Sequence, residues 1–232
     1  MRIRTLIGTV LVALCLAGCS KASYPGDRGG MYDAENNQAI PAEDYDAIVT
    51  VKRSPTDTLY FQLSDNDRLF PSHYQNARGL EMQRAICHLT EYPYLDSPYG
   101  HYVQVHWLEL LEKGMVLKSA ATGAGDGLDI LNDWMTSVED GFLTLHYRTW
   151  WGSGSVRHRL TLHSGLNPDD PYELLLVHDA NGDEAVELAD ALVYFDINSL
   201  PDTEGQYKTL TLKWTSGEGA RTSRQFRFRS RE

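Results

Sequence analysis

The sequence predicts an all-β protein, with a small N-terminal barrel followed by a C-terminal antiparallel β-sandwich. Short runs in which apolar and polar residues alternate recur along the chain, and this is the period of a half-buried strand. Clusters of Gly, Asp, Asn and Ser separate these runs at short intervals, as turns do. No long stretch shows the 3.6-residue apolar period of an amphipathic helix.

The size and charge of the chain limit its class. Its 232 residues suffice for one large or two small domains, and 42% hydrophobic with 23% charged residues is typical of a soluble globular protein. The formal net charge is −11 at pH 7. We therefore expect no nucleic-acid partner, because nucleic-acid affinity comes largely from neutralising phosphates with basic side chains.

The N-terminus has the form of a secretory signal. Arg2 and Arg4 precede an apolar run from Leu6 to Leu16 that is shorter than the roughly 20 residues of a membrane-spanning helix. The run ends in Leu16-Ala17-Gly18-Cys19, which resembles the lipobox of bacterial lipoproteins. We expect residues 1–18 to be a signal peptide and Cys19 to carry the lipid that holds the protein on a membrane.

A polar stretch follows the lipobox. Residues 19–43 begin with small, glycine-rich and polar residues that offer little to bury, so we expect a flexible tether. The three cysteines of the chain are Cys15, Cys19 and Cys87. With the first removed and the second acylated, only Cys87 remains, so the mature chain forms no internal disulfide and Cys87 is expected to be buried and structural.

The predicted barrel covers residues 44–119. Val49 and Val51 alternate with Thr50 and Lys52, which is the pattern of a half-buried strand. The five expected strands are Ala47 to Val51, Leu59 to Leu63, Gln83 to Thr90, Tyr102 to Leu111 and Met115 to Leu117.

A run of small residues at 120–127, with three glycines, predicts the boundary between the domains. The predicted sandwich covers residues 128–232. Leu210, Leu212 and Trp214 alternate with polar residues, so one face of that strand should be buried. The expected strands are Phe142 to Arg148, Val156 to His163, Tyr172 to His178, Ala191 to Ile197, Lys208 to Trp214 and Gln225 to Arg229.

Several of these segments resemble one known family in their order and spacing. The segments are Asp44 to Lys52, Tyr60 to Leu63, Gln83 to Ala85, Leu174 to Asp183 and Tyr194 to Leu200. They resemble the NigD-like lipoproteins of Bacteroides-type bacteria. The resemblance implies an OB-like domain, a β-sandwich, a place in the cell envelope and a role in bacteriocin immunity, and it supplies no catalytic residues. Val177-His178-Asp179 stands where the family usually has Arg-His-Asn.

Two adjacent tryptophans are the most unusual feature of the second half. Trp150 and Trp151 follow Arg148 and precede a glycine-rich turn. Neighbours on a strand point to opposite faces, so one ring could be buried while the other is exposed. Either the pair belongs to the core, or an exposed ring contacts a glycan or protein partner, for which tryptophan is suited.

Asp179, Asn181 and Asp183, with Asp190 further along, are the best metal candidates. Oxygen ligands at the first, third and fifth positions open a calcium loop, although the glycine and the last ligand do not follow the usual spacing. A hairpin turn favours the same residue types. The turn is the preferred interpretation and calcium the alternative, so we expect no metal and no cofactor.

The C-terminal strand is strongly basic. Phe226 and Phe228 should point inward, which leaves Arg227 and Arg229 pointing outward. Outward charges protect an edge strand from pairing with another chain. Alternatively, these arginines attract an anionic glycan or an acidic partner.

Together these features favour a non-enzymatic, lipid-anchored envelope protein, located in the outer membrane, that binds a protein, peptide or glycan. Partner contacts are assigned to Trp150, Trp151, Arg148, Arg227 and Arg229. No serine-hydrolase elbow or metal-binding histidine spacing is found. The alternative is a glycan-processing or other hydrolytic envelope enzyme that uses two of the 32 carboxylates as a pair.

Overall fold

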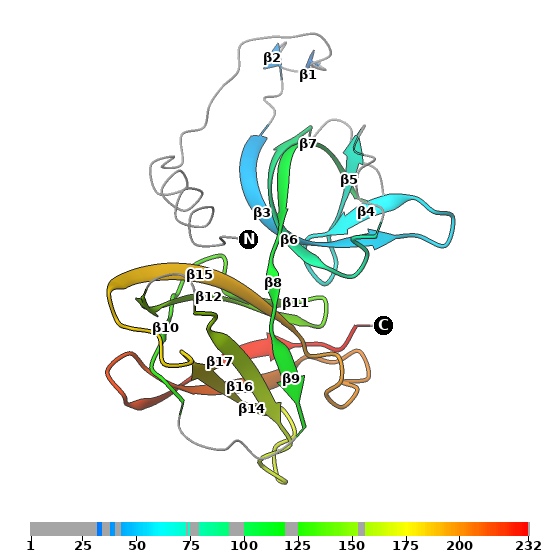
Figure 1. Cartoon of the computed structure of the whole chain (residues 1–232). Coiled ribbons are helices and arrows are strands. Elements are labelled where there is room, and N and C mark those ends of the chain that lie inside the picture. The colour runs from blue at the N-terminus through cyan, green and yellow to red at the C-terminus, as the bar shows by residue number, and fades with distance from the viewer. Residues whose placement is uncertain are drawn as a thin grey trace. The chain divides into compact units, whose positions relative to one another are not determined.

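A computed structural model describes residues 32–33, 38–39, 43–72, 74, 79–92, 100–118, 125–152 and 156–231. These residues form strands and no helix (Figure 1). No described helix is therefore long and apolar enough to cross a membrane. The expected signal peptide, Cys19 and most of the tether lie outside the described residues.

The strands in chain order are β1 (Tyr32–Asp33), β2 (Gln38–Ala39), β3 (Glu43–Arg53), β4 (Leu59–Gln62), β5 (Arg68–Ser72), β6 (Arg84–Glu91), β7 (His101–Leu110), β8 (Glu112–Lys113), β9 (Met115–Leu117), β10 (Asp129–Ile130), β11 (Ser137–Glu139), β12 (Phe142–Trp151), β13 (Arg159–Ser164), β14 (Glu173–Asp179), β15 (Glu187–Asp196), β16 (Lys208–Thr215) and β17 (Arg221–Phe228). Within the predicted tether, β1 and β2 form a short antiparallel pair.

The first unit is a closed barrel in which the strands follow the order β3-β4-β5-β7-β6 (Figure 1). All neighbours are antiparallel except β5 and β7, which run parallel. The interior is filled by alternate residues of each strand, including Val49, Val51, Phe61, Leu69, Cys87, Leu89 and Val103, all with 0% exposure. This is the small barrel that the alternating runs predict, and it agrees with the OB-like domain that the family resemblance implies.

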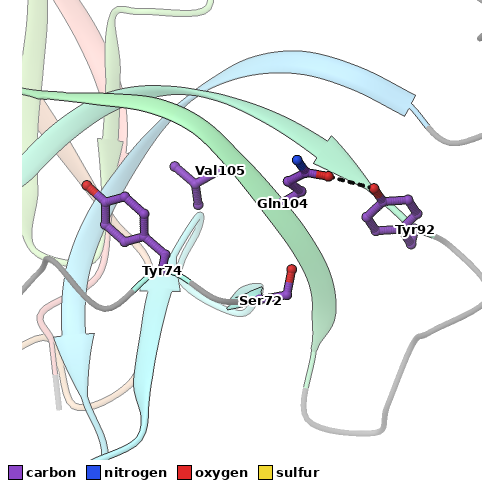
Figure 2. Close-up of a pocket in the computed structure, with 5 residues that line it drawn as sticks. All are labelled: Ser72, Tyr74, Tyr92, Gln104 and Val105. Carbon is purple, nitrogen blue, oxygen red and sulfur yellow. Dashed lines mark hydrogen bonds between the residues drawn. The ribbon is translucent and has the colours of Figure 1, made fainter.

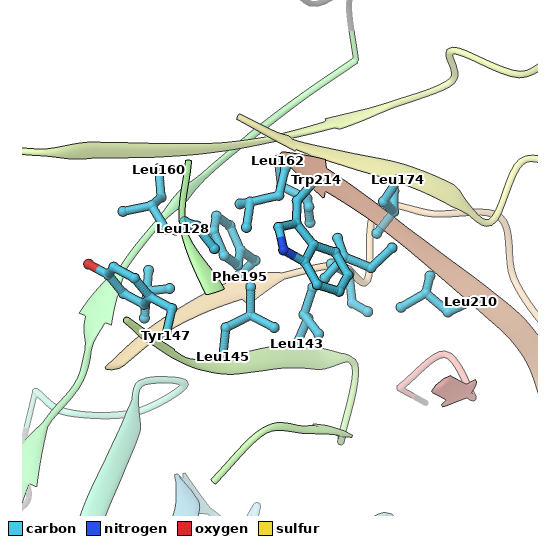
Figure 3. Close-up of a cluster of buried hydrophobic side chains, with 14 of the residues drawn as sticks. Leu128, Leu143, Leu145, Tyr147, Leu160, Leu162, Leu174, Phe195, Leu210 and Trp214 are labelled. Carbon is cyan, nitrogen blue, oxygen red and sulfur yellow. The ribbon is translucent and has the colours of Figure 1, made fainter. Parts of the chain in front are cut away.

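The second unit is a sandwich of two sheets. One sheet has the order β10-β12-β15-β8, with β11 also paired to β12, and the other has the order β17-β16-β14-β13-β9. Apolar residues from the inner faces of both sheets meet in one core (Figure 3). Leu210, Leu212 and Trp214 lie in it, as their spacing predicts. The all-β class with barrel and sandwich is thus confirmed.

Not every pairing in the sandwich is antiparallel. β14 pairs with β16, β13 with β9 and β15 with β8 in parallel. We expected an antiparallel sandwich from the alternation of apolar and polar residues. Alternation tells which face of a strand is buried, but it does not encode the direction of the neighbouring strand.

The division between the units falls earlier than the sequence suggested. The chain divides between Leu111 and Glu112, whereas we expected the barrel to run to residue 119 and the sandwich to start at residue 128. β8 and β9 explain the difference, because both pair with strands of the sandwich. Gly114 fits between them because a Cβ there would lie 2.2 Å from a ring carbon of buried Phe195.

The glycine-rich segment also differs from the expected linker where it is described. A Cβ on Gly125 would lie 2.8 Å from the His178 carbonyl oxygen, and one on Gly127 would lie 2.4 Å from that of Ser216. These glycines therefore let the chain pack closely against two sandwich strands. A linker and a tight packing site use the same small residues, which is why sequence alone could not separate them.

The fifth strand of the barrel is β5 instead of the expected Met115 to Leu117 segment. β5 contains Pro71, which cannot donate a ladder hydrogen bond and weakens the strand pattern. The sequence signal for this strand was therefore poor.

Candidate functional site

The two tryptophans at the end of β12 lie on opposite faces of their sheet. Trp150 is 50% exposed, and its direct cross-strand partner is Leu188 of β15, which is 48% exposed. Directly opposed side chains on one face of a sheet lie close enough to touch. Val186, two residues before Leu188, is 67% exposed and continues the same alternation.

An ion pair borders these apolar side chains. Arg148 lies two residues before Trp150 and opposite Asp190. Its Nε and Nη2 donate to the two Asp190 carboxylate oxygens at 2.5 and 2.9 Å, so the contact is bidentate. Such geometry holds the guanidinium in one orientation. We call Trp150, Leu188, Val186, Arg148 and Asp190 the β12–β15 outer patch.

A buried histidine lies next to the ion pair on the same face of the sheet. His146 precedes Arg148 by two residues and is 3% exposed. Its Nδ1 lies 2.5 Å from an Asp133 oxygen, and its Nε2 lies 3.7 Å from Asp190. The segment between β10 and β11 covers this histidine, because the Leu131 N–H donates to the His146 carbonyl and the His146 N–H donates to the Thr136 hydroxyl. The β12–β15 outer patch is therefore bordered by a histidine that hydrogen bonds hold in place.

Trp151 has a different role from Trp150. Its indole ring stacks on His158 with centroids 4.1 Å apart and planes 16° apart, and it packs against the core. Its N–H donates to the Ala189 carbonyl at 3.1 Å. This ring therefore stabilises the sandwich, and of the two tryptophans assigned to a partner from the sequence, only Trp150 presents its ring to solvent.

A buried histidine–aspartate cluster lies behind Trp151. His158 Nε2 is 3.1 Å from Asp183 Oδ2, and His158 Nδ1 is 3.0 Å from His178 Nε2. The same Asp183 oxygen accepts the Gly152 N–H at 2.7 Å. Side-chain exposure is 1% for His158 and 3% for Asp183. Since a carboxylate only accepts, His158 Nε2 carries the proton that it shares with Asp183.

The environment shifts two pKa values in this cluster. Burial, together with the neighbouring His158, lowers the pKa of His178 below its ordinary 6.5. The Gly152 N–H and then the His158 side chain lower the pKa of the Asp183 carboxyl. In the described part of the chain neither imidazole hydrogen-bonds to a serine, threonine or cysteine side chain. The cluster therefore joins the segments that carry Gly152, His158, His178 and Asp183 through shared protons.

The calcium candidates Asp179, Asn181, Asp183 and Asp190 make hydrogen bonds to different partners. Asn181 has a φ of 55° and its N–H donates to the Asp179 carboxylate at 2.8 Å, as in a hairpin turn. Asp183 faces His158, whereas Asp190 binds Arg148. Among the described residues there is no group of three or more His, Cys, Asp or Glu side chains that could hold a metal ion. These contacts favour the turn interpretation, and calcium binding stays an untested alternative.

The basic C-terminal strand lies at the edge of the other sheet of the sandwich. β17 is an outer strand of its sheet and pairs only with β16 in the described topology. Phe228 is fully buried, as expected, and Phe226 packs against the core. The guanidinium carbons of Arg227 and Arg229 lie 4.1 and 5.2 Å from the Tyr207 ring centroid. The structure therefore brings these two arginines together but does not join them to Trp150.

Two further side chains of a reactive type, Cys87 and Thr90, lie on β6 of the barrel. Cys87 is fully buried and its thiol contacts the Ala47 carbonyl, and burial raises its pKa to about 12. It is therefore a neutral thiol, as expected. The Thr90 hydroxyl donates to Asp44 and lies 2.6 Å from His106 Nε2. Because its single proton goes to Asp44, Thr90 accepts a hydrogen bond from His106.

Sequence reasoning missed Leu188 and the contact between His146 and Asp133. Leu188 lies 38 positions from Trp150, and the two meet only through the β12–β15 register. No local pattern in the sequence marks such a pair.

The fold and its exposed patch define a two-domain β protein with an OB-like barrel ahead of a β-sandwich. Residues 115–228 match the family model described as NigD-like C-terminal beta sandwich domain. This half of the chain is therefore similar to the NigD-like C-terminal domain, and the family resemblance predicted from the sequence is confirmed.

Solved structures with the same fold cover nearly the whole described chain. A protein described as toxin-related from Parabacteroides distasonis is 27% identical, with a TM-score of 0.66 over 81% of this chain and 94% of that one. A NigD-like immunity protein from Bacteroides caccae is 19% identical, with a TM-score of 0.55 over 78% and 91%. A protein described as a lipoprotein from Bacteroides fragilis is 10% identical, with a TM-score of 0.54 over 82% and 100%. The search of curated proteins found no match.

Proposed function

We propose that this protein is a non-enzymatic, lipid-anchored component of the cell envelope that binds a protein or peptide partner through the β12–β15 outer patch. The observation that carries the proposal is the pairing of exposed Trp150 with exposed Leu188 beside the fixed Arg148–Asp190 ion pair. Tryptophan and arginine are the residue types most enriched at binding hot spots.

The chemistry of the patch favours a protein or peptide over a glycan. Leu188 and Val186 offer aliphatic surface, which gains most from contact with other apolar side chains. Arg148 is 44% exposed even while it binds Asp190, so this ion pair lies at the surface. An apolar contact with a charged border is the usual anatomy of a protein interface.

The family and its structural neighbours support the biological role. One neighbour is described as a NigD-like immunity protein and another as a lipoprotein. We infer that the role is bacteriocin immunity, with the partner being a bacteriocin-like peptide or its envelope target. We also infer that the anchor is a lipid on Cys19 in the outer membrane.

Affinity capture tests the binding site. Wild-type protein and a Trp150→Ala variant are used to capture partners from the envelope fraction, with and without bacteriocin-like peptides encoded by neighbouring genes. Truncating a hot-spot tryptophan costs more than about 2 kcal/mol, or about thirtyfold in affinity. The control is Trp107→Ala, which removes a 37% exposed tryptophan of the barrel. If wild type and Trp150→Ala capture the partner equally, the β12–β15 outer patch is not the binding site.

Fractionation tests the anchor. A Cys19→Ala variant should leave the membrane pellet and appear in the soluble fraction. If the variant still pellets with membranes after a high-salt wash, the lipid on Cys19 is not what holds the protein there.

A further inference from the structure

Three aromatic rings form a row across the outside of the barrel. Phe70 of β5 lies directly opposite Tyr102 of β7, and the register of β4 with β5 places Tyr60 next to Phe70 on the other side. The ring centroids are 6.4 Å apart for Tyr60 and Phe70 and 5.9 Å apart for Phe70 and Tyr102. We call these three residues the aromatic row. None of them belongs to the barrel core, and Tyr102 is 41% exposed.

The backbone beside the row is shaped to hold it. Gly100, next to the start of β7, has a φ of 142°, and a Cβ there would lie 2.2 Å from the Arg68 carbonyl oxygen and 3.0 Å from the Phe70 ring. Only glycine lets the chain pass this close to β5. The Arg68 guanidinium carbon lies 5.3 Å from the Tyr60 ring centroid and borders the row at one end.

A hollow lies beside this outer face, and two of its lining residues, Tyr74 and Val105, also pack against the barrel core. It has a volume of about 390 Å³ and is lined by Ser72, Tyr74, Tyr92, Gln104 and Val105 (Figure 2). Ser72 and Gln104 lie opposite each other, two residues beyond Phe70 and Tyr102 along β5 and β7. Side chains two apart on a strand share a face, so the hollow lies directly beside the aromatic row.

The polar groups of the hollow are oriented by hydrogen bonds. The Tyr92 hydroxyl donates to Gln104 Oε1 at 2.9 Å, which leaves the amide NH2 of Gln104 as its donor side (Figure 2). The Ser72 hydroxyl donates to the Val103 carbonyl at 3.1 Å, so its oxygen lone pairs remain acceptors. The hollow thus offers a fixed donor and a fixed acceptor a short distance from aromatic faces.

We propose that the aromatic row and the adjacent hollow form a binding site for an uncharged oligosaccharide. A pyranose ring has apolar C–H faces that pack on aromatic rings, and a rim of hydroxyls that need both donors and acceptors. The aromatic row can pack against the apolar faces of the sugar rings. Gln104 can donate to the sugar hydroxyls, and Ser72 can accept from them. A row that spans three strands suits an extended chain of several sugars better than a single sugar.

The charges on this surface favour an uncharged ligand. None of the five side chains lining the hollow is charged at neutral pH. Among the described residues bordering this surface, Arg68 stacks on Tyr60 and Glu91 lies 3.1 Å from His101. A strand of nucleic acid or an acidic glycan would also meet a chain of net charge −11.

This site is separate from the β12–β15 outer patch, because every residue in it belongs to the barrel unit. The two proposals can therefore fail independently. A glycan site on the barrel would give the protein a second contact in the envelope, in addition to its protein or peptide partner.

Isothermal titration of the soluble chain beginning at Ser20 tests the site. The probes are hexasaccharides of α-1,4-glucose, β-1,4-glucose, β-1,4-mannose, β-1,4-xylose and β-1,4-N-acetylglucosamine. We expect at least one to bind. Tyr102→Ala and Gln104→Ala, both at the surface, should each weaken that binding by about tenfold or more. Trp107→Ala, an exposed aromatic outside the row, and Trp150→Ala should leave it unchanged.

Two outcomes would overturn the proposal. The first is that no neutral hexasaccharide binds while circular dichroism shows the chain folded. The second is that binding occurs but survives both Tyr102→Ala and Gln104→Ala. Polygalacturonate and a single-stranded oligonucleotide are titrated in parallel, and binding of either one alone, lost in Tyr102→Ala, would assign the surface to an anionic chain instead.

Discussion

The barrel and the sandwich bury their reactive groups in different ways. The barrel closes one sheet on itself, and its core contains Cys87, a thiol that burial keeps neutral. The sandwich has open ends, where loops cover the cluster of His158, His178 and Asp183. The sandwich thus buries a histidine–aspartate cluster, whereas the barrel core holds a neutral thiol. The two units should therefore respond differently to mutation and to pH.

The difference can be measured because each unit carries its own probe. Cys87 is the only cysteine in the chain beginning at Ser20, so its labelling by a thiol reagent reports opening of the barrel. Trp134, Trp150, Trp151 and Trp214 all lie in the sandwich, so their fluorescence reports mainly its unfolding. A change made in the sandwich should alter the second signal and leave the first unchanged.

The largest expected effect comes from removing β8 and β9. A fragment of residues 125–231 should be less stable than one of residues 112–231 by about 3 kcal/mol or more, because it loses two parallel pairings and the packing of Val116 against the core. Urea unfolding of both fragments measures this, and both contain the same tryptophans. If the two fragments are equally stable, the domain boundary lies at residues 120–127, as the sequence suggested.

The tryptophan pair gives the next largest effect. Trp151→Ala should destabilise the sandwich by about 3 kcal/mol, because it empties a site between His158 and the core. Trp150→Ala should change stability by less than about 0.5 kcal/mol, since its ring is half exposed. Fluorescence-monitored unfolding separates the two. If both substitutions destabilise equally, the β12–β15 outer patch is part of the fold and not a free surface.

A smaller effect is expected at the turn between β8 and β9. Gly114→Ala should cost about 1 to 3 kcal/mol, because the new methyl group would overlap the buried Phe195 ring. The Gly114 N–H also donates to the Tyr194 carbonyl, so the chain has little room to move away. The sandwich transition should shift while Cys87 labelling of the barrel stays as in wild type. A shift of both would mean that the units unfold together.

The smallest effect concerns pH. Because the pKa of His178 is lowered in the folded state, the unfolded chain binds a proton first as the pH falls below 6.5. Stability of the sandwich should therefore decrease from pH 7 towards pH 5. His178→Gln, whose amide can still donate to His158, should reduce this slope. The same slope in variant and wild type would show that His178 is not the titrating group.

Local sequence patterns predicted part of the fold. Alternation predicted the all-β class, the burial of Leu210, Leu212 and Trp214, and the opposite orientation of the two tryptophans. These features depend on the geometry of a single strand, in which successive side chains point to opposite faces. A buried Cys87 also followed from its place in an apolar strand.

What only the tertiary structure decided is which strands become neighbours. β9 could not be assigned to the sandwich from its own three residues, and nothing local pairs Leu188 with Trp150 or Tyr60 with Phe70 and Tyr102. Alternation fixes the face that a side chain occupies, but it carries no information on the partner strand, its direction or its register. Both proposed binding surfaces are made of such cross-strand neighbours, so the sequence determined their residues one by one and the fold brought them together.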